Sequence, residues 1–62
     1  MSDRYRVTYI HASGEQAHSY WMDSTGALAM ARAWEAEGER DVRVEADDGE
    51  VWTVDAFTTM VS

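Results

Sequence analysis

Apolar and polar side chains alternate along two stretches of the chain, residues 4–11 and residues 42–46. Alternation of this kind is typical of β-strands with one buried face. Each stretch runs into polar residues that end in a glycine, Gly14 in the first case and Gly49 in the second. A glycine at the end of a short polar loop favours a hairpin whose last loop residue has a positive φ. We therefore expect two β-hairpins.

The loop of the first hairpin has two possible lengths, residues 13–14 or residues 12–14. A two-residue type I′ turn needs a positive φ at Ser13, and serine is poorly suited to that conformation. We therefore prefer the three-residue loop.

The three-residue loop fixes the register of the first hairpin, with Tyr9 opposite Ala17 and Tyr5 opposite Trp21. The second face of the sheet then carries Ile10, His18, Tyr20 and Met22. The opposite choice, with Tyr20 and Met22 facing inward, also satisfies the pattern.

A helix is predicted between the hairpins, over residues 27–37. Residues 23–25 are Asp, Ser and Thr, which are good N-cap residues, and Gly38 is placed to end the helix. At 3.6-residue spacing one helix face carries Ala27, Met30, Ala31 and Trp34. Small residues on this face allow the helix to approach a sheet closely.

In the second hairpin a loop over residues 47–49 places Val44 opposite Trp52 and Val42 opposite Val54, all of them apolar. The fold prediction is an α+β class: one domain over residues 1–62, with a four-stranded antiparallel sheet of two hairpins and one helix on one face (ββαββ). We expect Trp21, Trp34 and Trp52 to meet in the core. Residues 58–62 either extend the last strand or reach a neighbouring subunit.

A chain of 62 residues without cysteine has few means of stabilising itself. Domains of this size bury about 60% of the unfolded chain's surface, and disulfides and thiolate metal sites are excluded. Oligomerisation is the remaining support. The sequence has no apolar run near 18 residues and no charged-then-apolar leader, so we expect no membrane association and a cytoplasmic location.

Twelve acidic residues against five arginines and no lysine give a net charge of -7, which disfavours bulk nucleic-acid binding. Four acids follow one another around the predicted end of the helix: Glu35, Glu37, Glu39 and Asp41. The helix dipole disfavours negative charge there. This acidic rim is either a solvated surface or a docking surface for a basic partner.

Three groups of residues have the composition of a chemical site, and none has its spacing. His11, His18 and Glu15 include common metal ligands, but the two histidines point to opposite faces in the preferred register. His11, Ser13 and Glu15 lie within one tight turn, which cannot present a nucleophile to a base across a pocket. Residues 47–50 lack the spacing of a calcium loop. We expect no metal, no cofactor and no enzymatic activity.

One helix of roughly 13 residues, with its capping residues included, is about 20 Å long and about 10 Å wide, too small to cover a four-stranded sheet. The face away from the helix is expected to bind a partner through Arg4, Arg6, Ile10, Tyr20, Met22, Arg43, Val51 and Phe57.

We therefore expect a non-enzymatic interaction module that forms a homodimer through this sheet face and docks a basic partner on its acidic rim. In the dimer the arginines of one copy would meet Glu45 or Asp55 of the other. The alternative is single-stranded nucleic acid, with bases stacked on Tyr20 and Phe57.

The length, the acidity and the strand-strand-helix-strand-strand order resemble those of small accessory proteins of unknown function from bacteria and phages. The resemblance extends over the whole chain and implies no site residues, because it includes no diagnostic motif.

Overall fold

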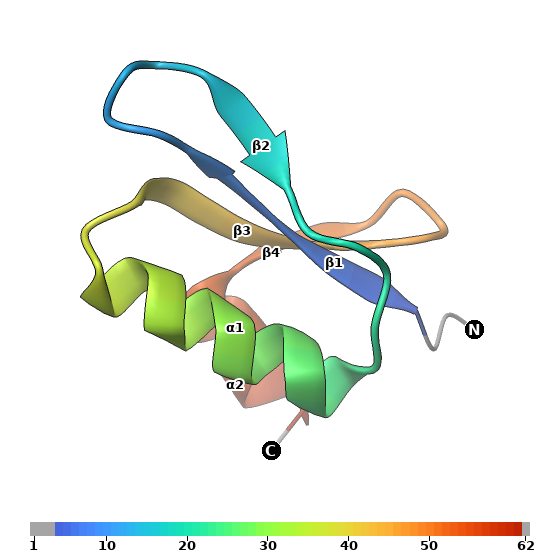
Figure 1. The fold of residues 1–62 in the computed structure, drawn as a ribbon. Helices are drawn as coiled ribbons and strands as arrows, with labels where there is room; N and C mark the ends of the chain where they lie inside the picture. Colours follow the sequence, from blue (N-terminus) through green and yellow to red (C-terminus); the bar gives the residue numbers. More distant parts are fainter. Residues whose placement is uncertain (1–3, 62) are drawn as a thin grey trace.

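The computed structural model describes residues 4–61, which form a four-stranded antiparallel sheet and two helices (Figure 1). The elements follow one another as β1 (Tyr5–Ile10), β2 (Gln16–His18), α1 (Ser24–Ala36), β3 (Arg40–Ala46), β4 (Val51–Thr53) and α2 (Val54–Val61). The strand order is β2-β1-β3-β4, so the two hairpins join side by side through β1 and β3. The α+β class and the four-stranded sheet are confirmed, whereas the prediction of a single helix (ββαββ) is wrong.

Both hairpins close with three-residue loops. His11 N–H donates to Glu15 O at 2.9 Å in the first hairpin, and Ala46 N–H donates to Glu50 O at 2.8 Å in the second. The glycines that end the two loops have φ values of 91° and 98°, a conformation that side chains disfavour. The preferred loop length of the first hairpin is therefore confirmed.

The predicted register holds near both loops, where Tyr9 lies opposite Ala17 and Val44 lies opposite Trp52. It fails at the start of β1, where Tyr5 pairs with Met22 instead of Trp21.

The side chain of Ser19 makes a hydrogen bond at the point where the register of β1 changes. Its Oγ accepts a hydrogen bond from Val7 N–H at 2.9 Å, and its own N–H donates to Val7 O at 2.9 Å. One extra residue then separates this pairing from the pairing of Tyr5 with Met22, as in a β-bulge. Met22 consequently packs against the core.

Local signals define α1 as the sequence predicts. Asp23 is the N-cap, and its side chain accepts a hydrogen bond from Gly26 N–H at 2.7 Å. After the last turn Gly38 has a φ of 91° and Glu39 N–H donates to Trp34 O at 3.1 Å, the bond that closes a Schellman motif.

The second helix replaces the predicted C-terminal strand or tail. Thr53 Oγ1 accepts a hydrogen bond from Ala56 N–H at 3.2 Å, which caps the first turn of α2. Apolar residues at Val54, Phe57 and Val61 face the core. Residues 58–61 are therefore helical, and Ser62 lies outside the described residues.

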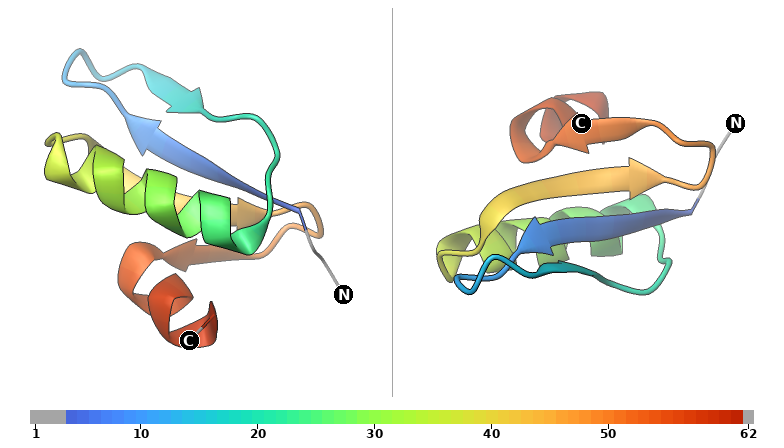
Figure 2. Two further views of the ribbon diagram at one scale, coloured as in Figure 1. Left: turned by 60° about the horizontal axis from the view of Figure 1, so that its bottom comes forward. Right: turned by 90° about the horizontal axis from the view of Figure 1, so that it is seen from above.

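Both helices lie on the same side of the sheet, as the two views in Figure 2 show. The centre of the core is made by fully buried side chains, of which the largest are Phe57, Val7 and Val44. Ala27 and Ala31 of α1 are also fully buried. Their small side chains let the helix backbone lie close to the strands.

The three tryptophans do not meet, contrary to the prediction. The rings of Trp34 and Tyr9 lie 4.0 Å apart at one end of the core. Trp52 packs at the other end, 6.0 Å from the ring of Tyr5. Trp21 is 38% exposed and lies outside the core, because the bulge after Ser19 turns it to the other side of the sheet.

Across residues 4–61, neither helix has the length and apolar character that a bilayer crossing requires.

Candidate functional site: the open sheet face

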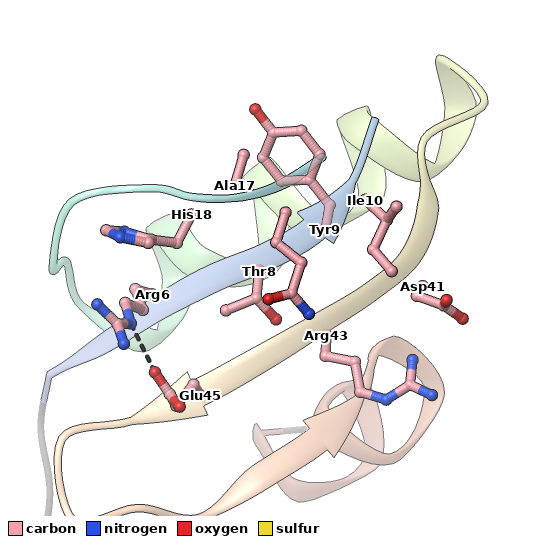
Figure 3. Close-up of a pocket in the computed structure, with 10 residues that line it drawn as sticks. Arg6, Thr8, Tyr9, Ile10, Ala17, His18, Asp41, Arg43 and Glu45 are labelled. Atoms are coloured by element: carbon pink, nitrogen blue, oxygen red, sulfur yellow. Dashed lines mark hydrogen bonds and ion pairs between the residues drawn. The ribbon is translucent and has the colours of Figure 1, made fainter. Parts of the chain in front are cut away.

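The side of the sheet opposite both helices is the open face, and it contains a hollow of about 640 Å³ (Figure 3). Side chains from β1, β2 and β3 line this hollow. Those used below are Arg6, Thr8, His18, Asp41, Arg43 and Glu45.

Strand pairing arranges the open face in rows that run across the strands. In the central row Thr8 of β1 lies between His18 and Arg43, its partners on the two neighbouring strands. In the next row Arg6 lies beside Glu45, which in turn lies beside Val51 of β4. The rows contain basic, acidic and apolar side chains next to one another.

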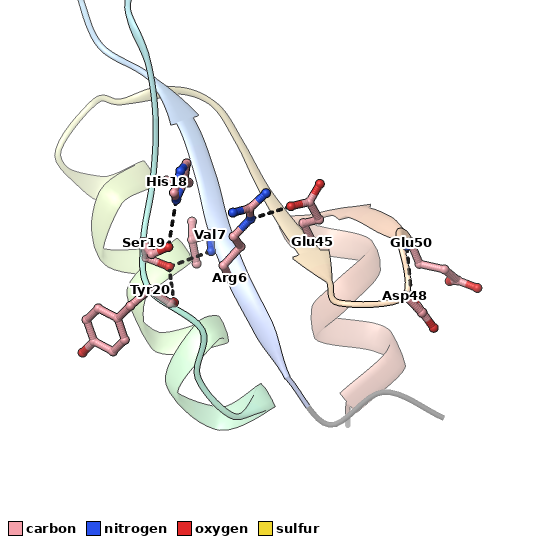
Figure 4. Close-up of polar contacts among 8 residues, drawn as sticks. All are labelled: Arg6, Val7, His18, Ser19, Tyr20, Glu45, Asp48 and Glu50. Carbon is pink, nitrogen blue, oxygen red and sulfur yellow. Dashed lines mark hydrogen bonds and ion pairs between the residues drawn. The ribbon is translucent and has the colours of Figure 1, made fainter.

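Arg6 is held within its own molecule. Its Nε donates a hydrogen bond to Glu45 Oε1 (Figures 3 and 4). Its guanidinium lies 4.7 Å from the centre of the Trp21 ring. The side chains of Arg6 and Glu45 are 28% and 27% exposed. Stacking on an indole and pairing with a carboxylate both favour a fixed guanidinium. The guanidinium of Arg6 is therefore a fixed part of the open face, and it is poorly placed to bind a phosphate group.

Unlike Arg6, Arg43 and Asp41 have no ion pair among residues 4–61, although both side chains line the hollow. Asp41 has a φ of 51° and lies where the pairing of β1 with β3 shifts by one residue, and aspartate tolerates this left-handed conformation better than most residues. The hollow thus contains one cation and one anion that are available to a partner.

The charges of the hollow balance. Two arginines and two acids line it, so its net charge is zero, and the rest of the chain carries the whole net charge of -7. Arg40 pairs with Ile10 at the end of β1 and adds one more positive charge nearby. Within residues 4–61, the part of the open face that forms the hollow therefore carries no net charge, in contrast to the acidity of the chain as a whole.

The structure brings together only part of the predicted sheet-face site. Arg6, Ile10, Arg43 and Val51 lie on the open face. Arg4 lines a separate small depression with Trp21 at the edge of the sheet.

Three other members of the predicted site lie elsewhere. Phe57 is fully buried in α2 and Met22 packs against the core, so their placement on the open face is wrong. Tyr20 is 73% exposed, but its ring points away from the sheet beyond β2 (Figure 4). Asp55, expected to oppose the arginines, lies in the first turn of α2. Trp21 was not expected on this side of the sheet.

The predicted acidic rim divides into three parts. Glu35 and Glu37 are exposed at the end of α1. Glu39 is half-buried, with its Oε2 3.4 Å from Nδ1 of His11, and Asp41 belongs to the hollow. Only the first two residues form an exposed acidic surface.

We expect the double variant Glu35→Gln, Glu37→Gln to be as stable as the parent or slightly more stable. No basic residue lies in the last turn of α1, so both carboxylates oppose the helix dipole, at a cost of about 0.3 to 1 kcal/mol each before solvent screening. Chemical denaturation measures the difference. A clear loss of stability would show that these carboxylates make a favourable contact.

Residues 4–61 contain no group of three or more histidine, aspartate or glutamate side chains arranged to hold a metal ion. His11 faces Glu39, whereas His18 lies on the open face. Comparisons of the chain with protein-family models, with curated proteins and with solved structures found no match.

Proposed function

We propose that this protein is a non-enzymatic interaction module that forms a two-fold dimer through its open sheet face. The observation that carries the proposal is the local absence of net charge on that face, in a chain that otherwise carries a net charge of -7. Two copies with this charge repel one another over most of their surfaces. They can approach most closely where the charge balances, and on the open face it does.

The composition of the open face supports the same proposal. Val51 is 54% exposed on β4, and Trp21 is 38% exposed beneath Arg6. Apolar and aromatic side chains with arginine are the residues that interfaces favour. In a two-fold contact each favourable pair of residues forms twice. A small patch therefore contributes more to the stability of the dimer.

The area of the open face indicates how tightly two copies can bind each other. The two inner strands, of six and seven residues, are about 20 Å long, and the two outer strands, of three residues each, are about 10 Å long. At a strand spacing of about 4.8 Å the flat footprint is about 300 Å² per copy. Two such footprints amount to about 600 Å², well below the range of about 1,200 to 2,000 Å² that is usual for stable interfaces. We therefore expect a weak dimer, with a dissociation constant in the micromolar range.

A basic protein partner on the exposed carboxylates of Glu35 and Glu37 remains part of the proposal, since neither has an ion pair within residues 4–61. Single-stranded nucleic acid has less support on the open face. Phe57 is buried, Tyr20 points away, and Arg6 is already paired with Glu45.

Sedimentation equilibrium over a concentration series, with and without a single-stranded oligonucleotide, tests the proposed function. We expect the mean mass to rise from the monomer to twice that value across the micromolar range and to be unaffected by the oligonucleotide. A monomer at every concentration would contradict self-association. A mass that increases only when the oligonucleotide is present would favour the nucleic-acid alternative.

A further inference from the structure

We infer that the dimer is held in one register by two identical ion pairs, each between Asp41 of one copy and Arg43 of the other. The inference rests on the proposed function, because it specifies the contact by which the open faces pack. These two side chains are a cation and an anion that line the hollow without an ion pair within residues 4–61.

The position of the two residues fits a two-fold axis. Both lie on β3, an inner strand, two positions apart, and both line the hollow. A two-fold axis in the plane of the interface, crossing β3 between them, sets residue 41 of each copy opposite residue 43 of the other. This single operation forms both ion pairs.

An arrangement that left these groups unpaired would be unfavourable. When two sheet faces pack, water leaves the space between them, and an unpaired charge enclosed there loses its hydration without gaining a partner. A face-to-face dimer in another register would enclose Arg43 or Asp41 without a partner, or would set like charges together. The two residues therefore favour the register in which they meet, and they oppose the others.

The other two charged side chains that line the hollow, Arg6 and Glu45, are already paired with each other. Arg6, the other cation, is also fixed by its stacking on Trp21. Within residues 4–61, Asp41 and Arg43 are thus the charged side chains lining the hollow that have no ion pair, and a second copy offers the complementary set.

Charge reversal at the two positions tests the inference directly. Arg43→Glu leaves an acid at both positions 41 and 43, and Asp41→Arg leaves an arginine at both, so two copies of either variant repel each other at both contacts. We expect each to dimerise at least about tenfold more weakly than the parent, a loss of about 1.4 kcal/mol. An equimolar mixture of the two variants should form a heterodimer with both ion pairs restored, and its dissociation constant should lie near that of the parent.

Two matched variants control for the change in net charge. Arg32→Glu and Asp55→Arg make the same changes at exposed positions of α1 and α2, on the other side of the sheet. We expect each to dimerise nearly as the parent does, and their mixture to show no preference for the heterodimer.

Asp41 needs one additional control because its φ of 51° is unfavourable for arginine. Asp41→Asn keeps a residue that tolerates this conformation and removes only the charge. We expect it to weaken the dimer without changing the melting temperature measured at low concentration, where the parent is also monomeric. If Asp41→Arg does not fold, the comparison of Asp41→Asn with Arg43→Glu still tests both ends of the pair.

The experiment separates this inference from the proposed function. If the parent is a monomer, the proposed function fails and the ion pairs fail with it. If the parent dimerises, but the two charge-reversal variants dimerise equally well or their mixture shows no recovery, the dimer stands and the Asp41–Arg43 register is wrong.

Discussion

Phe57→Ala is expected to leave the protein largely unfolded at 25 °C. Phe57 is fully buried in α2, with its ring centre 5.2 Å from that of Tyr5 and 5.5 Å from that of Trp52. Truncating a buried phenylalanine costs about 3 to 5 kcal/mol. A chain of this length has a total stability of about 3 to 9 kcal/mol. The loss therefore approaches the whole free energy of folding.

Met60→Ala is the matched control on the same helix, because its side chain is 45% exposed. We expect this variant to lose less than about 1 kcal/mol, as is usual for surface substitutions. Thermal and urea unfolding, followed by circular dichroism, measure both variants. A Phe57→Ala protein that melts within a few degrees of the parent would show that α2 does not close the core.

The hairpins and the first helix could be predicted because their signals are local. A glycine at the end of each loop and an N-cap before α1 each act within a few residues. The alternation of apolar and polar residues then predicts which side of β1 and β3 is buried. Val7 and Val44 are fully buried on that side. None of these features depends on how distant segments pair.

The second helix was missed because its residues prefer strands in isolation. Four of its eight residues are valine or threonine, which are β-branched. Tertiary contacts outweigh this preference, since burial of Val54 and Phe57 on one side requires a helical period. The capping threonine at position 53 and the acid at Asp55 were the available signals for a helix start.

The open face was predicted only in part because two of its determinants are not local. The neighbour of β1 is β3, and only this pairing brings Arg6 beside Glu45. The bulge after Ser19 depends on a side-chain hydrogen bond to Val7. It moves Trp21 out of the core and Met22 into it, which reverses the alternation that the sequence suggests.

Tyr20→Glu illustrates what the bulge changes. On the register expected from the sequence, Tyr20 lies on the open face, and a charge there would dissociate the dimer. In the structure its ring points away from the sheet beyond β2 (Figure 4). We therefore expect Tyr20→Glu to dimerise as the parent does, which makes it a control for a charge placed within the hollow.

Thr8→Glu is the corresponding change inside the hollow, and it is expected to weaken dimerisation strongly while preserving the fold of the monomer. Thr8 lies in the central row of the open face, directly opposite Arg43. A carboxylate there can pair with Arg43 of its own copy, as opposite charges on neighbouring strands do. The fold therefore keeps its stability, while the face becomes acidic and Arg43 is no longer available to the second copy.

We expect Thr8→Glu to raise the dissociation constant by at least about tenfold, because each copy encloses one more charge in the interface. Its melting temperature at low concentration, where the parent is also monomeric, should match that of the parent. Tyr20→Glu adds the same charge outside the face and should leave the dissociation constant unchanged. If Thr8→Glu dimerises normally and Tyr20→Glu does not, the contact runs along the edge of β2 and the open face is not the interface.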